Sequence, residues 1–223
     1  MTQAQTVVIV LCKSPELGRV KTRLAVTVGA TRALGVYQYL LTRTFDALRD
    51  VDASIVVCAD GDLSKMPQHS FTVLTQRGED LGARMLHALQ DVGPVKSAIL
   101  IGTDSPMLNG SIISSAIEML RSADVVLGPS TDLGYYLVGF NSPIPDIFRD
   151  MPWSTCRVLE RTYNRCDELG LRTILLEPLT DIDTRADIEE LLGGGRDARR
   201  TYEEIMAIIE EDSDATAHRS SPS

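Results

Sequence analysis

Short apolar runs alternate with amphipathic segments along most of the chain, and this alternation limits the possible folds more than any other feature of the sequence. The first run, VVIVLC over 7–12, is apolar and rich in β-branched residues, which is typical of a strand covered on both faces. Over 30–48, apolar residues recur every three or four positions, which predicts an amphipathic helix. The same two patterns predict strands over 53–60, 71–76, 97–102, 124–129, 135–140 and 172–177, and helices over 80–90, 111–121, 155–169, 184–192 and 198–211.

Buried strands that alternate with helices predict a Rossmann-like α/β fold, with a mostly parallel twisted sheet, right-handed crossovers and helices on both faces. The strand over 135–140 follows the strand over 124–129 with no helix between them, so we expect it to be antiparallel. A chain of 223 residues is long enough for one domain with a substantial core. We therefore expect one domain over 1–212 and a disordered tail over the polar residues 213–223.

The charge balance limits the partners. A net charge of −9 argues against nucleic acid, which needs a basic surface. No apolar run approaches the roughly 20 residues of a membrane helix, and the first residues lack a secretory signal, so we expect a cytoplasmic protein without a membrane span. Within this acidic chain, eleven residues near the N-terminus hold four cations, which indicates a small anionic ligand; they are Lys13, Arg19, Lys21 and Arg23.

These four cations follow the first predicted strand. In an open α/β sheet, ligands bind outside the carboxyl ends of the strands. A loop there with Gly18, arginines and lysines can hold several phosphate oxygens through side chains and free backbone N–H groups. The spacing matches neither a P-loop nor a dinucleotide fingerprint, and a solvated basic loop is the alternative.

Two acidic segments also follow predicted strands. Asp104 comes after the strand over 97–102, where one carboxylate is enough for Mg²⁺ if water and phosphate complete the shell. The alternative is that Asp104 or Ser105 caps the next helix. Asp181 and Asp183 alternate after the last strand, so their side chains share one side of an extended segment. A helix start at this point is the alternative for Asp183.

A further group of residues could bind a second, small polar substrate. Two segments, over 128–136 and 153–155, supply a turn, a carboxylate, hydroxyls and aromatic rings, which together suit such a ligand. Ordinary turn and core roles are the alternative. The candidate acceptor-binding residues are Asp132, Gly134, Tyr135, Trp153, Ser154 and Thr155.

Six motifs along the chain resemble a known family. In order, they are VIVLCKSPELGRVKTRLA, QRGEDLGARM, GTDSP, GPSTDLGYYLVG, PWST and DIDT. Over roughly residues 6–192 the chain resembles the domain-of-unknown-function 2064 (DUF2064) family of the nucleotide-diphospho-sugar transferase superfamily, which has the glycosyltransferase-A fold. The KTRLA segment is also similar to guanylyltransferases such as the 2-phospho-lactate enzyme.

The resemblance implies roles for individual residues. It implies that Lys13, Lys21 and Arg23 contact nucleotide phosphates. The base and ribose pocket would be shaped by Gln76, Gly78 and Gly82, and Mg²⁺ or Mn²⁺ would be held by Asp104 with Asp183 and Asp181. The family typically has DGGYYL where this chain has Leu133 in place of the first glycine, beside the expected acceptor pocket.

Together these features predict a metal-dependent transferase that uses a nucleotide and a small-molecule acceptor, with Asp104, Lys21 and Arg23 as the catalytic residues. The family name favours transfer of a sugar from a nucleotide-sugar. The compact group of cations also suits a triphosphate, hence nucleotidyl transfer with release of pyrophosphate. Leu133 supports a third hypothesis, a nucleotide-binding module without turnover. The sequence indicates neither the base, the acceptor nor the oligomeric state.

Overall fold

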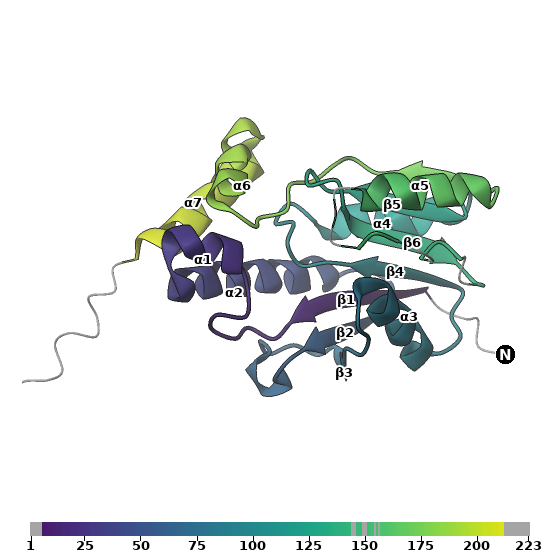
Figure 1. The fold of residues 1–223 in the computed structure, drawn as a ribbon, viewed down its shortest axis with the longest axis horizontal. Helices are drawn as coiled ribbons and strands as arrows, with labels where there is room; N and C mark the ends of the chain where they lie inside the picture. The colour runs from purple at the N-terminus through teal and green to yellow at the C-terminus, as the bar shows by residue number, and fades with distance from the viewer. Residues whose placement is uncertain (1–5, 144–145, 149–150, 154, 156, 212–223) are drawn as a thin grey trace, which may run out of the picture.

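One seven-stranded sheet organises the protein (Figure 1). The computed structural model describes residues 6–143, 146–148, 151–153, 155 and 157–211. Its strands, in the order β3-β2-β1-β4-β6-β5-β7, are β1 (Thr6–Lys13), β2 (Ser54–Asp60), β3 (Thr72–Thr75), β4 (Ser97–Ile101), β5 (Val125–Pro129), β6 (Tyr135–Asn141) and β7 (Thr173–Leu175). The predicted tail over 213–223 lies outside the described residues.

The directions of the strands confirm the predicted fold class. β6 is antiparallel to both β4 and β5, whereas the remaining pairs in the sheet are parallel. Since β6 runs against its neighbours, its first residues lie at the edge where β4 and β5 end: Leu137 pairs with Ile101, and Tyr135 with Pro129. The start of β6 therefore borders the edge where ligands of such sheets bind.

Except for α1, for which the sequence predicted no range, the helices lie within a few residues of the predicted ranges. They are α1 (Thr22–Val28), α2 (Ala30–Leu48), α3 (Leu81–Val92), α4 (Gly110–Met119), α5 (Val158–Glu168), α6 (Arg185–Glu190) and α7 (Arg196–Glu210), with 3₁₀ turns η1 (Leu63–Lys65) and η2 (Leu191–Gly193). The hypothesis that Asp104 or Ser105 caps α4 is wrong, because the Asn109 side chain accepts a hydrogen bond from the Ile112 N–H and begins that helix. None of the described helices is both long enough and apolar enough to cross a membrane.

Helices cover both faces of the sheet, and alternate residues of each strand supply the two cores (Figure 1). From β1, Val8 and Val10 point into the core formed with α2 and α4. Val7 and Ile9 point into the opposite core, with α3 and α5. Burial on both faces explains why the run over 7–12 is continuously apolar.

A third apolar cluster joins the two ends of the chain. Leu24 of α1 packs in one buried cluster with Ile188 of α6, Ile205 of α7 and Ile182 from the preceding loop. Figure 1 shows the helices α6 and α7 beside α1 and α2. This packing brings the loop before α6 next to the basic loop after β1.

Candidate functional site

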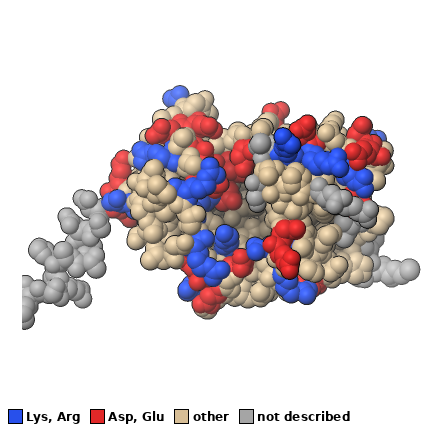
Figure 2. Space-filling model, in the orientation of Figure 1, with Lys and Arg blue, Asp and Glu red and all other residues tan. Residues whose placement is uncertain are grey.

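A cavity of about 300 Å³ opens at the carboxyl ends of β1 and β4. Its walls come from the loop after β1, the start of α1, the residues after β3 and the segments that follow β4 and β7. Figure 2 shows basic and acidic side chains gathered around the middle of this face of the molecule. The predicted residues that line the cavity are Lys13, Arg19, Lys21, Arg23, Gln76, Asp104 and Asp183.

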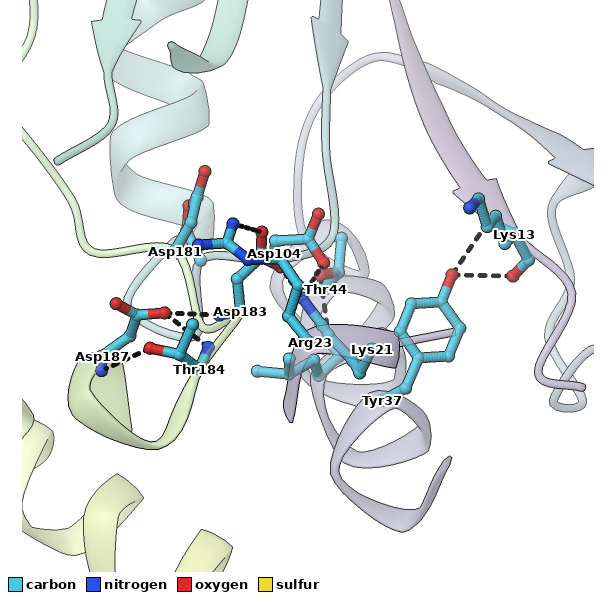
Figure 3. Close-up of polar contacts among 12 residues, drawn as sticks. Lys13, Lys21, Arg23, Tyr37, Thr44, Asp104, Asp181, Asp183, Thr184 and Asp187 are labelled. Carbon is cyan, nitrogen blue, oxygen red and sulfur yellow. Dashed lines mark hydrogen bonds and ion pairs between the residues drawn. The ribbon is translucent and has the colours of Figure 1, made fainter. Parts of the chain in front are cut away.

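Lys21 is the centre of the charged group in this cavity (Figure 3). Its Nζ contacts the Asp104 carboxylate and lies 3.1 Å from Asp183 Oδ1. The Arg23 guanidinium lies 3.2 Å from Asp183 Oδ2. Burial leaves the Lys21 side chain 3% exposed and by itself lowers the pKa of Lys21, but the two carboxylates outweigh it and the pKa is raised. Lys21 is therefore a buried but charged ammonium between two acidic groups.

Backbone contacts bring the two carboxylates together. The Ile182 N–H donates to the Asp104 carbonyl at 2.9 Å, so the segment before α6 is attached to the end of β4. Thr184 caps α6 in a capping box, with the Asp187 side chain accepting from the Thr184 N–H at 2.6 Å. Thr184 and Asp187 thus form the helix start that was the alternative role for Asp183. The Asp183 carboxylate remains in the cavity.

Tyr37, which the sequence analysis missed, fixes the end of β1. Its hydroxyl accepts from the Lys13 N–H at 2.8 Å and donates to the Lys13 carbonyl at 2.7 Å. Burial raises the pKa of Tyr37, which keeps the hydroxyl protonated for both bonds. In the sequence this tyrosine looks like one more core position of α2, because its spacing fits the apolar stripe.

Arg84 is a second residue that the sequence analysis missed. It lies in α3, lines the cavity, and its Nη1 is 3.3 Å from Asp60 Oδ2. By contrast, three glycines expected at the nucleotide lie outside the residues that line the cavity: Gly18, Gly78 and Gly82. Gly78 supplies a carbonyl that accepts from Arg84 Nε at 3.2 Å, and Gly82 allows Trp153 to pack closely, since a Cβ there would lie 2.7 Å from the indole.

A second cavity of about 210 Å³ borders the first and shares Asp104 with it. Asp181, Ser105 and Tyr135 are among its lining residues, and the Ser105 hydroxyl donates to the Asp181 carboxylate. Burial raises the pKa of Asp181 to about 7, and the charges of Asp104 and Asp132 act in the same direction. Asp181 thus faces the second cavity from beside Ser105.

The other residues expected at the acceptor lie elsewhere. The Asp132 carboxylate closes its own turn by accepting from the Gly134 N–H at 3.0 Å. Trp153 packs on Gly82, and Thr155 is exposed, with its hydroxyl donating to the Pro152 carbonyl at 2.6 Å. Ser154 lies outside the described residues. Of the described acceptor candidates, only Tyr135 lines the second cavity.

Leu133 does not border either of these two cavities. It has a φ of 69°, is 53% exposed, and lines a separate surface hollow with residues of α5 and β7. The departure from the family's glycine therefore changes the surface of the turn rather than the walls of the second cavity.

The residues at the first cavity fit a divalent cation. Asp104 and Asp183 both contact the same nitrogen of Lys21, so one positively charged group reaches both carboxylates. Two carboxylates with water and phosphate oxygens form the shell that Mg²⁺ prefers. Among the described residues there is no group of three His, Cys, Asp or Glu side chains placed to hold one ion.

The sheet order, with an antiparallel strand between two parallel parts, and the charged cavity at its edge define the glycosyltransferase-A class of α/β fold, which solved nucleotide-diphospho-sugar transferases and nucleotidyltransferases share. The chain belongs to the DUF2064 family, described as an uncharacterized protein conserved in bacteria, whose model matches residues 44–155. A protein from Desulfovibrio desulfuricans G20, provisionally named a nucleotide-diphospho-sugar transferase, is 32% identical; the match covers 92% of this chain and 96% of that chain, with a TM-score of 0.80.

More distant solved structures share the fold. Rv0371c from Mycobacterium tuberculosis H37Rv is 18% identical, with a TM-score of 0.58 over 86% of this chain and 100% of that chain, and it has also been solved with manganese. A CMP:2-keto-3-deoxy-manno-octonic acid synthetase complexed with CTP is 13% identical, with a TM-score of 0.58 over 85% of this chain and 98% of that chain. None of the curated proteins matches this chain.

Proposed function

We propose that the chain is a metal-dependent transferase with a nucleoside triphosphate as donor, and that it transfers the nucleotidyl group to a small acceptor with release of pyrophosphate. One observation carries the proposal: Lys13, Lys21 and Arg23 line a single cavity together with the carboxylates of Asp104 and Asp183. Cations and a carboxylate pair side by side are what a metal-bound polyphosphate requires.

The balance of charge favours a triphosphate over a diphosphate. Lys21 and Arg23 are paired with Asp104 and Asp183. A divalent ion on the two carboxylates would leave both cations, and Lys13, for phosphate oxygens. The combined positive charge of three cations and a divalent ion matches the charge of a triphosphate better than the smaller charge of a nucleotide-sugar.

Catalysis would consist mainly of positioning and neutralisation of charge. The ion would draw electron density from the phosphate oxygens that it contacts. Lys21 and Arg23 would stabilise the negative charge that develops on pyrophosphate as its bond to the α-phosphorus breaks. The acceptor would lie in the second cavity, between Asp181 and Tyr135, with its attacking oxygen directed past Asp104 to the α-phosphorus.

Sugar transfer from a nucleotide-sugar is the second candidate. The name of the Desulfovibrio desulfuricans relative favours it, as does the second cavity, which has room for a sugar ring beside the phosphates. In that reaction the bond at the anomeric carbon breaks and a nucleoside diphosphate leaves.

Product analysis separates these hypotheses. The protein would be incubated with Mg²⁺ or Mn²⁺, a small-molecule extract as the source of acceptor, and either nucleoside triphosphates or nucleotide-sugars. Pyrophosphate release that needs protein, metal and extract supports nucleotidyl transfer. Release of nucleoside diphosphate from a nucleotide-sugar supports sugar transfer, and nucleotide binding without either product supports a non-catalytic module.

A further inference from the structure

The side-chain amide of Gln76 is held in one orientation. Its Nε2 donates to the carbonyls of Cys12 and Cys58, each at 2.7 Å. The reversed amide would place Oε1 against those two carbonyl oxygens, and neither of them can donate a hydrogen bond. The two carbonyls therefore determine the orientation of the amide. Gln76 therefore presents Oε1 to the cavity as a fixed acceptor.

Arg84 places donors next to this acceptor. Its Nη1 lies 3.5 Å from Gln76 Oε1, and its Nε donates to the Gly78 carbonyl. Among the described residues, no partner is found for the two N–H groups of Nη2. The two N–H groups of Nη1 donate to Gln76 Oε1 and Asp60 Oδ2, so the donors that Arg84 can offer to a ligand beside Oε1 are the two N–H groups of Nη2. The other bonds of the planar guanidinium fix their direction.

The surroundings of Arg84 suit an uncharged ligand group. Asp60 lies 3.3 Å from Arg84 and neutralises its charge. Lys13, at the end of β1, has no acidic partner among the described residues, so its charge is available to a phosphate. Leu11 and Leu81 line the same cavity and offer apolar contact to a flat ring. The cavity thus has a charged end at Lys21 and Arg23 and a neutral, hydrogen-bonding end at Gln76 and Arg84.

We propose that Gln76 and Arg84 read the base of the nucleotide and select cytosine. The inference rests on the proposed function, because it takes the charged end to bind the phosphates. An acceptor followed by two donors matches the edge of cytosine, which offers an amino group and then two acceptors. Adenine offers the amino group and one acceptor, while uracil and guanine present a carbonyl first, so each forms fewer of these bonds.

Calorimetry with CTP, UTP, ATP and GTP in the presence of Mn²⁺ tests this proposal on the full chain. We expect CTP to bind at least about tenfold more tightly than each of the other three, the effect of one additional hydrogen bond to a charged donor. Inorganic tripolyphosphate, which has no base, measures the charged end separately.

Arg84→Met removes the donors. We expect it to weaken CTP binding by about tenfold or more and to remove the preference among bases, while tripolyphosphate affinity stays within about twofold. Arg84→Lys, which keeps the charge but not the planar fork, should lose most of the preference as well. Arg77→Met is the matched control, because Arg77 is 57% exposed, pairs with Asp91 and lies outside the residues that line the cavity.

The outcomes distinguish the two levels of the argument. Tighter binding of UTP, ATP or GTP than of CTP, or a CTP preference that survives in Arg84→Met, overturns the base assignment. If all four nucleotides bind equally tightly and tripolyphosphate also binds, the base assignment alone is overturned and the proposed function stands. No binding of tripolyphosphate or of any nucleotide with metal overturns both. Thermal unfolding of each variant shows whether it is folded.

Discussion

Two described residues other than glycine have a positive φ, and they lie in different parts of the molecule: Lys21, at 45°, and Leu133, at 69°. Such a conformation costs a residue with a Cβ about 1–2 kcal/mol. The Lys21 side chain is 3% exposed and touches two carboxylates, whereas Leu133 is 53% exposed. The same backbone strain therefore occurs once with a buried charged group and once with an exposed apolar one.

The difference shows when backbone strain indicates function. At Leu133, the turn itself explains the conformation: its N–H donates to Ser130 at 3.0 Å, and its carbonyl accepts from Leu159 at 3.2 Å. At Lys21, the strained residue begins α1 and directs its ammonium to Asp104 and Asp183. A strained residue that directs a buried charged side chain into a cavity indicates a ligand site. A strained residue whose backbone groups are hydrogen-bonded in a turn indicates only a turn.

The largest effect is expected at the carboxylates that Lys21 contacts. Asp104→Asn should lower the rate of product formation on the order of a thousandfold, because it removes a ligand of the ion and one of two charges in the site. The variant should still fold, because Lys21 keeps Asp183 as a partner. Asp52→Asn, an exposed position before β2, is the control. A rate above a third of wild type would remove Asp104 from the mechanism.

Removal of the strained lysine's charge is the next test. Lys21→Met should weaken triphosphate binding by about 10- to 100-fold, because a buried ammonium that meets phosphate loses a charge-assisted bond. Calorimetry with metal present measures this effect. Lys96→Met, at an exposed position just before β4, should bind normally. Normal binding by Lys21→Met would mean that the strain at Lys21 serves only the start of α1.

Asp181 is affected by both the site around Lys21 and the turn that holds Leu133. Burial raises its pKa most, and the charges of Asp104 in the site and Asp132 in the turn raise it further. Its folded pKa of about 7 is above the ordinary 3.8, so between these values the folded state keeps a proton that the unfolded state loses. The contribution of Asp181 to stability should therefore fall as pH rises from about 4 to 7, and then stay level.

Asp181→Asn cannot titrate, so its stability relative to wild type should rise across that pH window by on the order of 1–3 kcal/mol. Thermal unfolding in the presence of a chelator measures the difference, and a chelator is needed because a bound ion would change the charge balance. An equal difference in melting temperature at the two ends of the window would contradict the raised pKa.

The smallest effect is expected at Leu133. Leu133→Gly relieves the positive φ but adds freedom to the unfolded chain, so the stability should change by less than about 1 kcal/mol. Nucleotide binding and rate should stay within about twofold of wild type, because Leu133 lines neither cavity of the site. A tenfold loss of rate, by contrast, would place Leu133 in acceptor binding.

Much of the fold could be predicted, because it depends on local patterns. The continuous apolar run over 7–12 predicted a strand buried on both faces, and the missing helix before 135–140 predicted that β6 is antiparallel. Strand ends that share one edge also indicated that the cations and acids lie near one another. Their contact could not be predicted, since it depends on the Ile182–Asp104 bond and on the packing of α6 and α7 against α1.

The missed residues show the same limit. Arg84 looks like an ordinary cation on an amphipathic helix, and only the neighbouring order β3-β2-β1 places it over Asp60 and Gln76. Trp153 looked like an acceptor ligand, but the small Gly82 on a distant helix provides the surface on which it packs. Pairings between segments far apart in the chain leave no local pattern in the sequence.

The central claim is that the basic loop after β1 and the carboxylates of Asp104 and Asp183 form one site for a metal-bound polyphosphate. Calorimetric titration of a nucleoside triphosphate with and without Mn²⁺, on wild type and on Asp104→Asn, tests it most directly. The account predicts that Mn²⁺ tightens binding by at least about tenfold in wild type and has little effect in Asp104→Asn. The same metal effect in both proteins, or none in wild type, would contradict it.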